Sequence, residues 1–149
     1  MKILFLDIDG VCNSLNFART RQMNLVNAID PAAAKLVKQI VAETGCKIVI
    51  SSTWRAYPDA MEVVRREIGE ILDVTPSMEP HARGYEVEAW LEKHPEVVRH
   101  AILDDDVDFS DDQPLFKTSF NVGLTPKIAK RVIKYLNVEG QNEKNNINT

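Results

Sequence analysis

The chain has 149 residues, of which 44% are hydrophobic and 27% charged, and its 18 basic and 22 acidic side chains give a net charge of −4. These values are typical of one globular domain with a core of its own. They exclude a membrane span, because no apolar run approaches the roughly 20 residues that a span requires. The acidic balance also argues against binding along an extended nucleic-acid backbone.

The N-terminus leads directly into an apolar run. It lacks the basic stretch, apolar segment and small-residue cleavage site of a signal peptide, so we expect a cytoplasmic protein. Cys12 and Cys46 lie far apart and have no metal-binding or disulfide spacing. We therefore expect both to be reduced thiols.

The first third of the chain predicts a strand, a long connection and a helix. Lys2–Leu6 is a continuous apolar run, as expected of a strand buried on both faces. Residues 13–29 are polar and too long for a tight turn, which favours a loop over an active site and leaves a plain surface connection as the alternative. Asp30 and Pro31 are a helix cap and first residue, and Gly45 is well placed to end that helix.

The middle of the chain continues the alternation of strands and helices. Lys47–Ile50 is the second buried strand, and apolar residues at helical spacing then indicate a helix that ends near Gly69. Ile71–Val74 is predicted to form a short strand. The next helix is predicted to begin near Gly84 and to stop before Pro95.

The last third begins with the strong strand Ala101–Leu103, which breaks on three aspartates. A weaker strand, Phe116–Phe120, precedes a helix that starts at the Thr125-Pro126 pair and runs to about Leu136. We expect the domain to span residues 1–138, followed by a flexible polar tail over residues 139–149.

Apolar strands that alternate with helices predict an α/β fold. We expect a three-layer, Rossmann-like domain with a mostly parallel five-stranded sheet. In such sheets, ligands bind beyond the carboxyl ends of the strands.

Acidic and hydroxyl side chains follow the predicted strands at this same edge. Asp7 and Asp9 follow the first strand, Ser51 and Ser52 the second, and the acidic run from Asp104 the strand at Ala101–Leu103. Carboxylates crowded together raise one another's pKa unless a cation lies among them. Hard oxygen ligands suit Mg²⁺, which also binds substrate phosphate oxygens.

This arrangement can support phosphoryl transfer. A carboxylate beside the metal can attack phosphorus, and a second carboxylate two residues further on can donate a proton to the leaving group. Gly10 would let the backbone turn sharply after the first strand. A hydroxyl and a cationic side chain would hold the transferring group.

The segments DIDGV, VISSTWR and AILDDDVDF resemble the signature motifs of the haloacid dehalogenase superfamily, chiefly its phosphohydrolases. The resemblance extends from Met1 to about Leu136. The cluster SSTWR together with LDDD resembles more narrowly the haloacid-dehalogenase-like domain of Swiss Army knife RNA repair proteins. The resemblance implies a Mg²⁺-dependent phosphomonoester hydrolase.

The resemblance also implies roles for the acidic residues. Asp7 corresponds to the nucleophile and touches the metal, and Asp9 to the general acid and base, with its backbone carbonyl on Mg²⁺. Asp104 corresponds to a metal ligand at the third acidic strand end. Asp105 is a ligand through water or a residue that orients the others.

The resemblance further implies residues that bind the phosphoryl group. Ser51 matches the hydroxyl that bonds the phosphoryl oxygens, with Ser52 as an alternative or partner. Arg83 fits best as the basic residue, because it precedes the helix from Gly84, and Lys127 is the rival candidate.

Many members of the superfamily carry a large cap domain, and here both insertion positions are short. We therefore expect minimal or no cap and an open pocket, which can admit a phosphorylated small molecule or a nucleic-acid terminal phosphate. The alternative is a receiver-like, phosphate-sensing module without turnover. Hydrolysis of a carbon–halogen bond is disfavoured, since it needs neither Mg²⁺ nor an acid at Asp9.

Four further side chains keep two interpretations each. Trp54 could stack on a substrate base or pack in the core, and Arg55 could grip substrate or bridge nearby acids. Arg19 and Arg21 could meet a substrate phosphate or simply be solvated.

Overall fold

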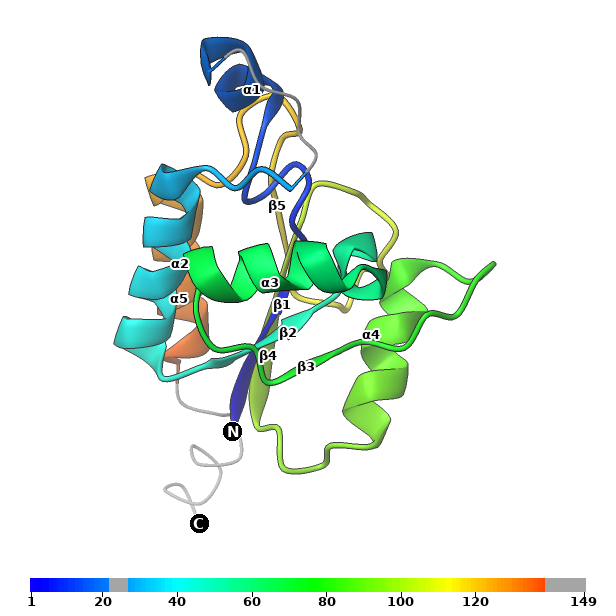
Figure 1. Ribbon diagram of the computed structural model, residues 1–149. Coiled ribbons are helices and arrows are strands. Elements are labelled where there is room, and N and C mark those ends of the chain that lie inside the picture. The colour runs from blue at the N-terminus through cyan, green and yellow to red at the C-terminus, as the bar shows by residue number, and fades with distance from the viewer. Residues whose placement is uncertain (22–26, 139–149) are drawn as a thin grey trace.

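A computed structural model describes residues 1–21 and 27–138. It contains five parallel strands in the order β3-β2-β1-β4-β5 (Figure 1). The strands are β1 Lys2–Leu6, β2 Lys47–Ile50, β3 Asp73–Val74, β4 Arg99–Asp104 and β5 Leu115–Lys117. The predicted tail at 139–149 and part of the 13–29 connection lie outside the described residues.

Helices cover both faces of the sheet and give three layers. The larger core cluster joins one face to α2 (Pro31–Thr44), α3 (Pro58–Glu67) and α5 (Pro126–Leu136). On the other face, α4 (Arg83–Glu92) packs against the sheet in a smaller cluster. Figure 1 shows α2 and α5 side by side, with α4 on the far side of the strands. The predicted Rossmann-like α/β fold is confirmed.

The helix ends follow from local sequence chemistry. The Asp30 carboxylate accepts a hydrogen bond from the Ala32 backbone N–H, and Pro31 occupies the first helical position of α2. Gly45 ends this helix with φ 71°, a left-handed conformation that glycine adopts without a steric cost. At the start of α5, the Thr125 side chain accepts a hydrogen bond from the Ile128 N–H, and Pro126 is the first helical residue.

Two predicted strands are shorter in the structure. β3 keeps only Asp73 and Val74, because these alone pair with the last two residues of β2 at the edge of the sheet. β5 starts at Leu115 and stops at Lys117, and the bridge between Ser119 and Gly123 then turns the chain. Phe120 therefore lies outside the sheet, in this turn.

The connection after β1 is not simply a loop. It contains the short helix α1 (Leu15–Arg21), which begins where the Ser14 hydroxyl accepts a hydrogen bond from the Phe17 N–H. Figure 1 places α1 beyond the edge of the sheet where the strands end. A 3₁₀ helix, η1 (Thr53–Ala56), likewise follows β2.

The direction in which the chain adds strands reverses beside β1. β2 and β3 extend the sheet on one side of β1, whereas β4 and β5 extend it on the other. Ligands of open α/β sheets bind at this switch point, beyond the carboxyl ends of the strands. The fold thus predicts a ligand-binding site at the carboxyl ends of β1 and β4.

Both cysteines are buried free thiols. Within the described ranges, no helix combines the length and the apolar composition that crossing a membrane requires.

We predict that Asp30→Ala lowers the free energy of unfolding by about 1 kcal/mol, because it removes the N-cap of α2. Urea unfolding followed by circular dichroism measures the effect. Asp111→Ala, at an exposed acid outside the helices, is the control. Equal stability of the two variants would contradict a capping role for Asp30.

Candidate active site

Three strand ends present polar side chains on one face of the sheet. Side chains alternate between the two faces along a strand. The residues that pack toward α4 include Phe5, Val49 and Ile102. The side chains two positions further on are those of Asp7, Ser51 and Asp104, and they emerge on this same face. Arg83, the first residue of α4, meets them there.

Three carboxylates converge at the switch point. One oxygen from each of Asp7, Asp104 and Asp105 lies within 4.8 Å of the other two. Asp7 is 5% exposed, Asp104 is fully buried and Asp105 is half-buried. A donor set of three carboxylates suits a hard divalent cation such as Mg²⁺. We call these three residues the acid triad.

The turn after β1 is shaped to admit Asp105. Gly10 has φ 80°, and a Cβ at this position would lie 2.4 Å from Asp105 Oδ2. The Gly10 N–H donates to Asn13 Oδ1 at 3.0 Å, and the Thr118 hydroxyl donates to the Gly10 carbonyl at 2.6 Å. Only glycine fits this turn without displacing the Asp105 carboxylate.

Arg83 supplies a positive charge to the triad. Its Nη1 lies 2.9 Å from Asp7 Oδ1 and 3.3 Å from Asp104 Oδ2. Burial acts to lower the pKa of Arg83, but the carboxylates of Asp7 and Asp104 outweigh it and raise this pKa. The guanidinium therefore stays charged. The rival candidate, Lys127, is exposed at the start of α5.

The aspartate pKa values show how costly this charge cluster is. Burial, followed by the charge of Asp104, raises the pKa of Asp7 to about 8, although Arg83 acts in the opposite direction. Burial also raises the pKa of Asp104, against the hydrogen bond from the Asp106 N–H. A cation among these oxygens would favour their ionised forms and restore a nucleophilic carboxylate at neutral pH.

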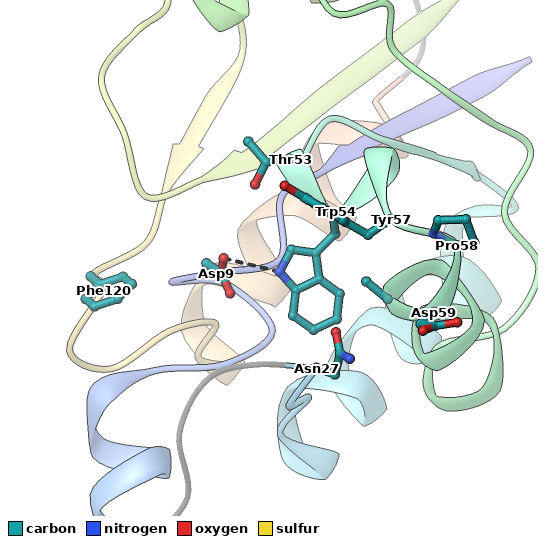
Figure 2. Close-up of a pocket in the computed structure, with 9 residues that line it drawn as sticks. Asp9, Asn27, Thr53, Trp54, Tyr57, Pro58, Asp59 and Phe120 are labelled. Atoms are coloured by element: carbon teal, nitrogen blue, oxygen red, sulfur yellow. Dashed lines mark hydrogen bonds between the residues drawn. The ribbon is translucent and has the colours of Figure 1, made fainter.

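Asp9 stands apart from the triad and is held separately. Its Oδ1 accepts a hydrogen bond from Asn13 Nδ2 at 2.8 Å, and its Oδ2 accepts one from the Trp54 indole N–H at 3.2 Å. Figure 2 shows the indole directed at this carboxylate. Two donors from different segments thus fix the orientation of a half-buried acid.

The two serines after β2 have different partners. Ser52 Oγ accepts a hydrogen bond from the Trp54 N–H and caps η1. Ser51 Oγ is buried and has no hydrogen-bond partner among the described residues. Thr75, which follows β3, has an equally buried hydroxyl without a partner in the described part of the chain. A buried hydroxyl without a partner is costly unless a ligand supplies one.

Arg55 binds the backbone carbonyls of both serines. Its guanidinium donates to the Ser51 and Ser52 carbonyls at 2.9 and 3.0 Å and pairs with Glu86 at 2.8 Å. Of its two interpretations, the structure supports a bridge to a nearby acid. Trp54, similarly, is mostly buried, and its indole N–H contacts Asp9.

The structure thus brings together Asp7, Asp104, Asp105, Arg83 and, on the same face, Ser51. It adds three residues that sequence reasoning missed: Asn13, Trp54 as a partner of Asp9, and Thr75. Asn13 lies four residues after Asp9, within reach of a tight turn, which was a usable signal. Nothing in the sequence indicates the Trp54 contact, which joins residues 45 positions apart.

The model of the family described as the HAD domain in Swiss Army Knife RNA repair proteins matches residues 3–129. The chain belongs to this family. No curated protein and no solved structure matches it. Membership supports a HAD-like domain with a phosphatase-type function, in a family of domains described from RNA repair proteins. The HAD family generally uses Mg²⁺, and the acid triad offers a fitting donor set.

We predict that Asp7→Asn stabilises the metal-free protein at pH 8. Folding raises the pKa of Asp7 to about 8. Above about pH 4 the unfolded chain loses this proton while the folded chain keeps it, so the free energy of unfolding falls as the pH rises towards 8. The advantage of the variant should therefore grow over this range, by about 3 °C in Tm for each kcal/mol. Thermal melts in a chelator, with Asp111→Asn as the control, measure it. A constant difference between pH 5 and pH 8 would argue against this assignment.

We also predict that Mg²⁺ raises the Tm through the triad. A ligand at a hundredfold excess over its dissociation constant stabilises a protein by about 2.7 kcal/mol. Asp104→Asn and Asp105→Asn should remove most of the Mg²⁺-dependent rise. Asp106→Asn, at the exposed neighbouring acid, should retain it. An equal rise in all four proteins would place the cation elsewhere.

Proposed function

We propose that this chain is a Mg²⁺-dependent phosphatase that hydrolyses a phosphomonoester through an aspartyl-phosphate on Asp7. One observation carries the proposal. At the β1–β4 switch point, the oxygens of Asp7, Asp104 and Asp105 converge, and Arg83 faces them. This site combines a nucleophile, a set of metal ligands and a fixed positive charge.

The triad and the backbone carbonyl of Asp9 would hold Mg²⁺. The ion would offset the negative charge of the carboxylates and attract the substrate phosphate. Arg83 would bind a phosphoryl oxygen, since its guanidinium already lies against Asp7. The unpartnered Ser51 hydroxyl would donate a second hydrogen bond.

The reaction has two steps. A carboxylate oxygen of Asp7 bonds to phosphorus, the ester P–O bond breaks, and its electron pair leaves with the alcohol oxygen, which takes a proton from Asp9. Asp9 then accepts a proton from water while the water oxygen attacks phosphorus and the bond to Asp7 breaks. The products are the alcohol and phosphate, and both carboxyl groups return to their starting states.

The position of Asp9 supports this division of roles. Its carboxylate is oriented by Asn13 and Trp54 and does not join the metal ligands. It is therefore free to exchange a proton while Asp7 carries the phosphoryl group. A carboxylate held apart from the metal ligands fits turnover better than a receiver-like module, because it can activate the water that breaks the intermediate.

The proposed substrate is a phosphomonoester at the end of a nucleotide or nucleic acid, handled in the cytoplasm. The family description, from RNA repair proteins, supports this class. The segment between β3 and α4 spans only residues 75–82, and α1 has seven residues, so no large cap covers the strand ends in the described part of the chain. An acidic chain is suited to contact one terminal phosphate rather than a long backbone.

Hydrolysis of a chromogenic aryl phosphate, with and without Mg²⁺, tests the function. We expect Mg²⁺-dependent turnover, loss of turnover in Asp7→Asn, and a 10²–10⁴-fold lower kcat in Asp9→Asn, since general acid–base catalysis contributes about this factor. Asp111→Asn is the control. Turnover that survives both active-site substitutions would refute the mechanism.

Mass spectrometry of Asp9→Asn after mixing with substrate tests the intermediate. We expect a protein that gains the mass of one phosphoryl group, which Asp7→Asn should not gain. A wild-type protein that gains the group and never releases it would instead favour the receiver-like alternative.

A further inference from the structure

A large cavity opens beside Asp9, and none of the three triad residues lines it. It has a volume of about 760 Å³, and its apolar walls are formed by Trp54, Tyr57, Pro58 and Phe120 (Figure 2). This volume lies in the range that accommodates small organic ligands. In the view of Figure 2, Phe120 and the Trp54 indole lie on opposite sides of Asp9.

Two of these aromatic rings are exposed. Tyr57 is 64% exposed and Phe120 is 41% exposed, whereas Trp54 is 7% exposed. Exposure alone is unremarkable, because Tyr85 on α4 is 62% exposed. What distinguishes Tyr57 and Phe120 is that they come from separate segments and line one cavity together with an acid of the proposed mechanism.

The charges around this cavity restrict what it can bind. Among the described residues, its lining includes the carboxylates of Asp9 and Asp59 but no lysine or arginine. A second phosphate would be repelled there. Arg83 instead lines a neighbouring cavity of about 560 Å³. The cavity beside Asp9 is therefore suited to a neutral group with flat apolar faces.

The proposed mechanism places the leaving group at this cavity, since Asp9 gives its proton to the leaving oxygen. We propose that the leaving group is a nucleoside whose base stacks on Tyr57 and Phe120. A nucleobase is flat and uncharged at neutral pH. Its polar edges match the amide of Asn27 and the hydroxyl of Thr53, which also line the cavity. This assignment rests on the proposed function and makes it more specific.

Stacking of a base on an aromatic side chain contributes about 1–3 kcal/mol, or roughly 5–150-fold in affinity. Ribose 5-phosphate carries the same ester without the base and is the matched substrate. We expect the wild type to prefer adenosine 5′-monophosphate over ribose 5-phosphate by about tenfold or more in kcat/KM. Tyr57→Ala and Phe120→Ala should each reduce this preference about tenfold, and Tyr85→Ala should not change it.

A binding measurement separates this inference from the phosphatase mechanism. Adenosine has no phosphate, and its binding to the Asp7→Asn protein can be followed by titration calorimetry. We expect adenosine to bind the Asp7→Asn protein. Adding Phe120→Ala to this protein should weaken the binding about tenfold, whereas adding Tyr85→Ala should leave it unchanged. Thermal melts check that each variant is folded, and Phe120→Leu, which keeps an apolar side chain without a ring, should also bind less tightly.

The two failures are distinguishable. Hydrolysis of ribose 5-phosphate as fast as adenosine monophosphate, with no adenosine binding, would overturn the base site and leave the phosphatase standing. Adenosine binding without turnover of any phosphomonoester would overturn the phosphatase mechanism and leave the base site standing. Comparing an oligonucleotide that carries a terminal phosphate with the free nucleotide identifies which of the two substrates is preferred. Both carry a base next to the phosphate, so preference for either one supports the base site.

Discussion

Two buried carboxylates held against one guanidinium determine how this site can work. Asp7 and Asp104 are almost inaccessible to solvent, and Arg83 is the cation that contacts both. With Asp105 beside them, three potential negative charges lie near the guanidinium of Arg83 in the described part of the chain. Burial of an uncompensated charge is expensive, so the folded chain either protonates a carboxyl group or gains a cation. The raised pKa values of Asp7 and Asp104 reflect this imbalance.

The site is rigid where the charges meet and more open where a substrate must enter. The triad lies at the carboxyl ends of the neighbouring strands β1 and β4, and the strand pairing fixes its backbone, since the Asp7 N–H donates to the Leu103 carbonyl at 3.0 Å. The proposed leaving-group cavity is built instead from η1, the start of α3 and the turn after β5. Precise positioning favours the strand ends, whereas loops and turns can vary to suit different leaving groups.

The sequence predicts the strands and the acid positions because their signals are local. A buried parallel strand is an apolar run. Asp7 directly follows β1 and Asp104 is the last residue of β4, so the sequence alone could place both acids at one edge of the sheet. The indole N–H of Trp54 could not be assigned to Asp9, because that contact depends on how η1 packs against the turn after β1. Helix α1 was missed because its seven residues carry only a weak periodic pattern. The choice between Arg83 and Lys127 needed the packing of α4, since both begin a helix.

The alternation of side chains along a strand also explains why two adjacent serines differ. Val49 faces α4 and Ile50 faces the larger core cluster. Ser51 continues the first series and is directed to the triad side, where its hydroxyl has no described partner, whereas Ser52 turns away and caps η1. A shift of one residue in the register of β2 would exchange these environments and place the capping hydroxyl on the α4 face. The capacity of Ser51 to bind a ligand is therefore set by the pairing of β2 with β1, rather than by the serine alone.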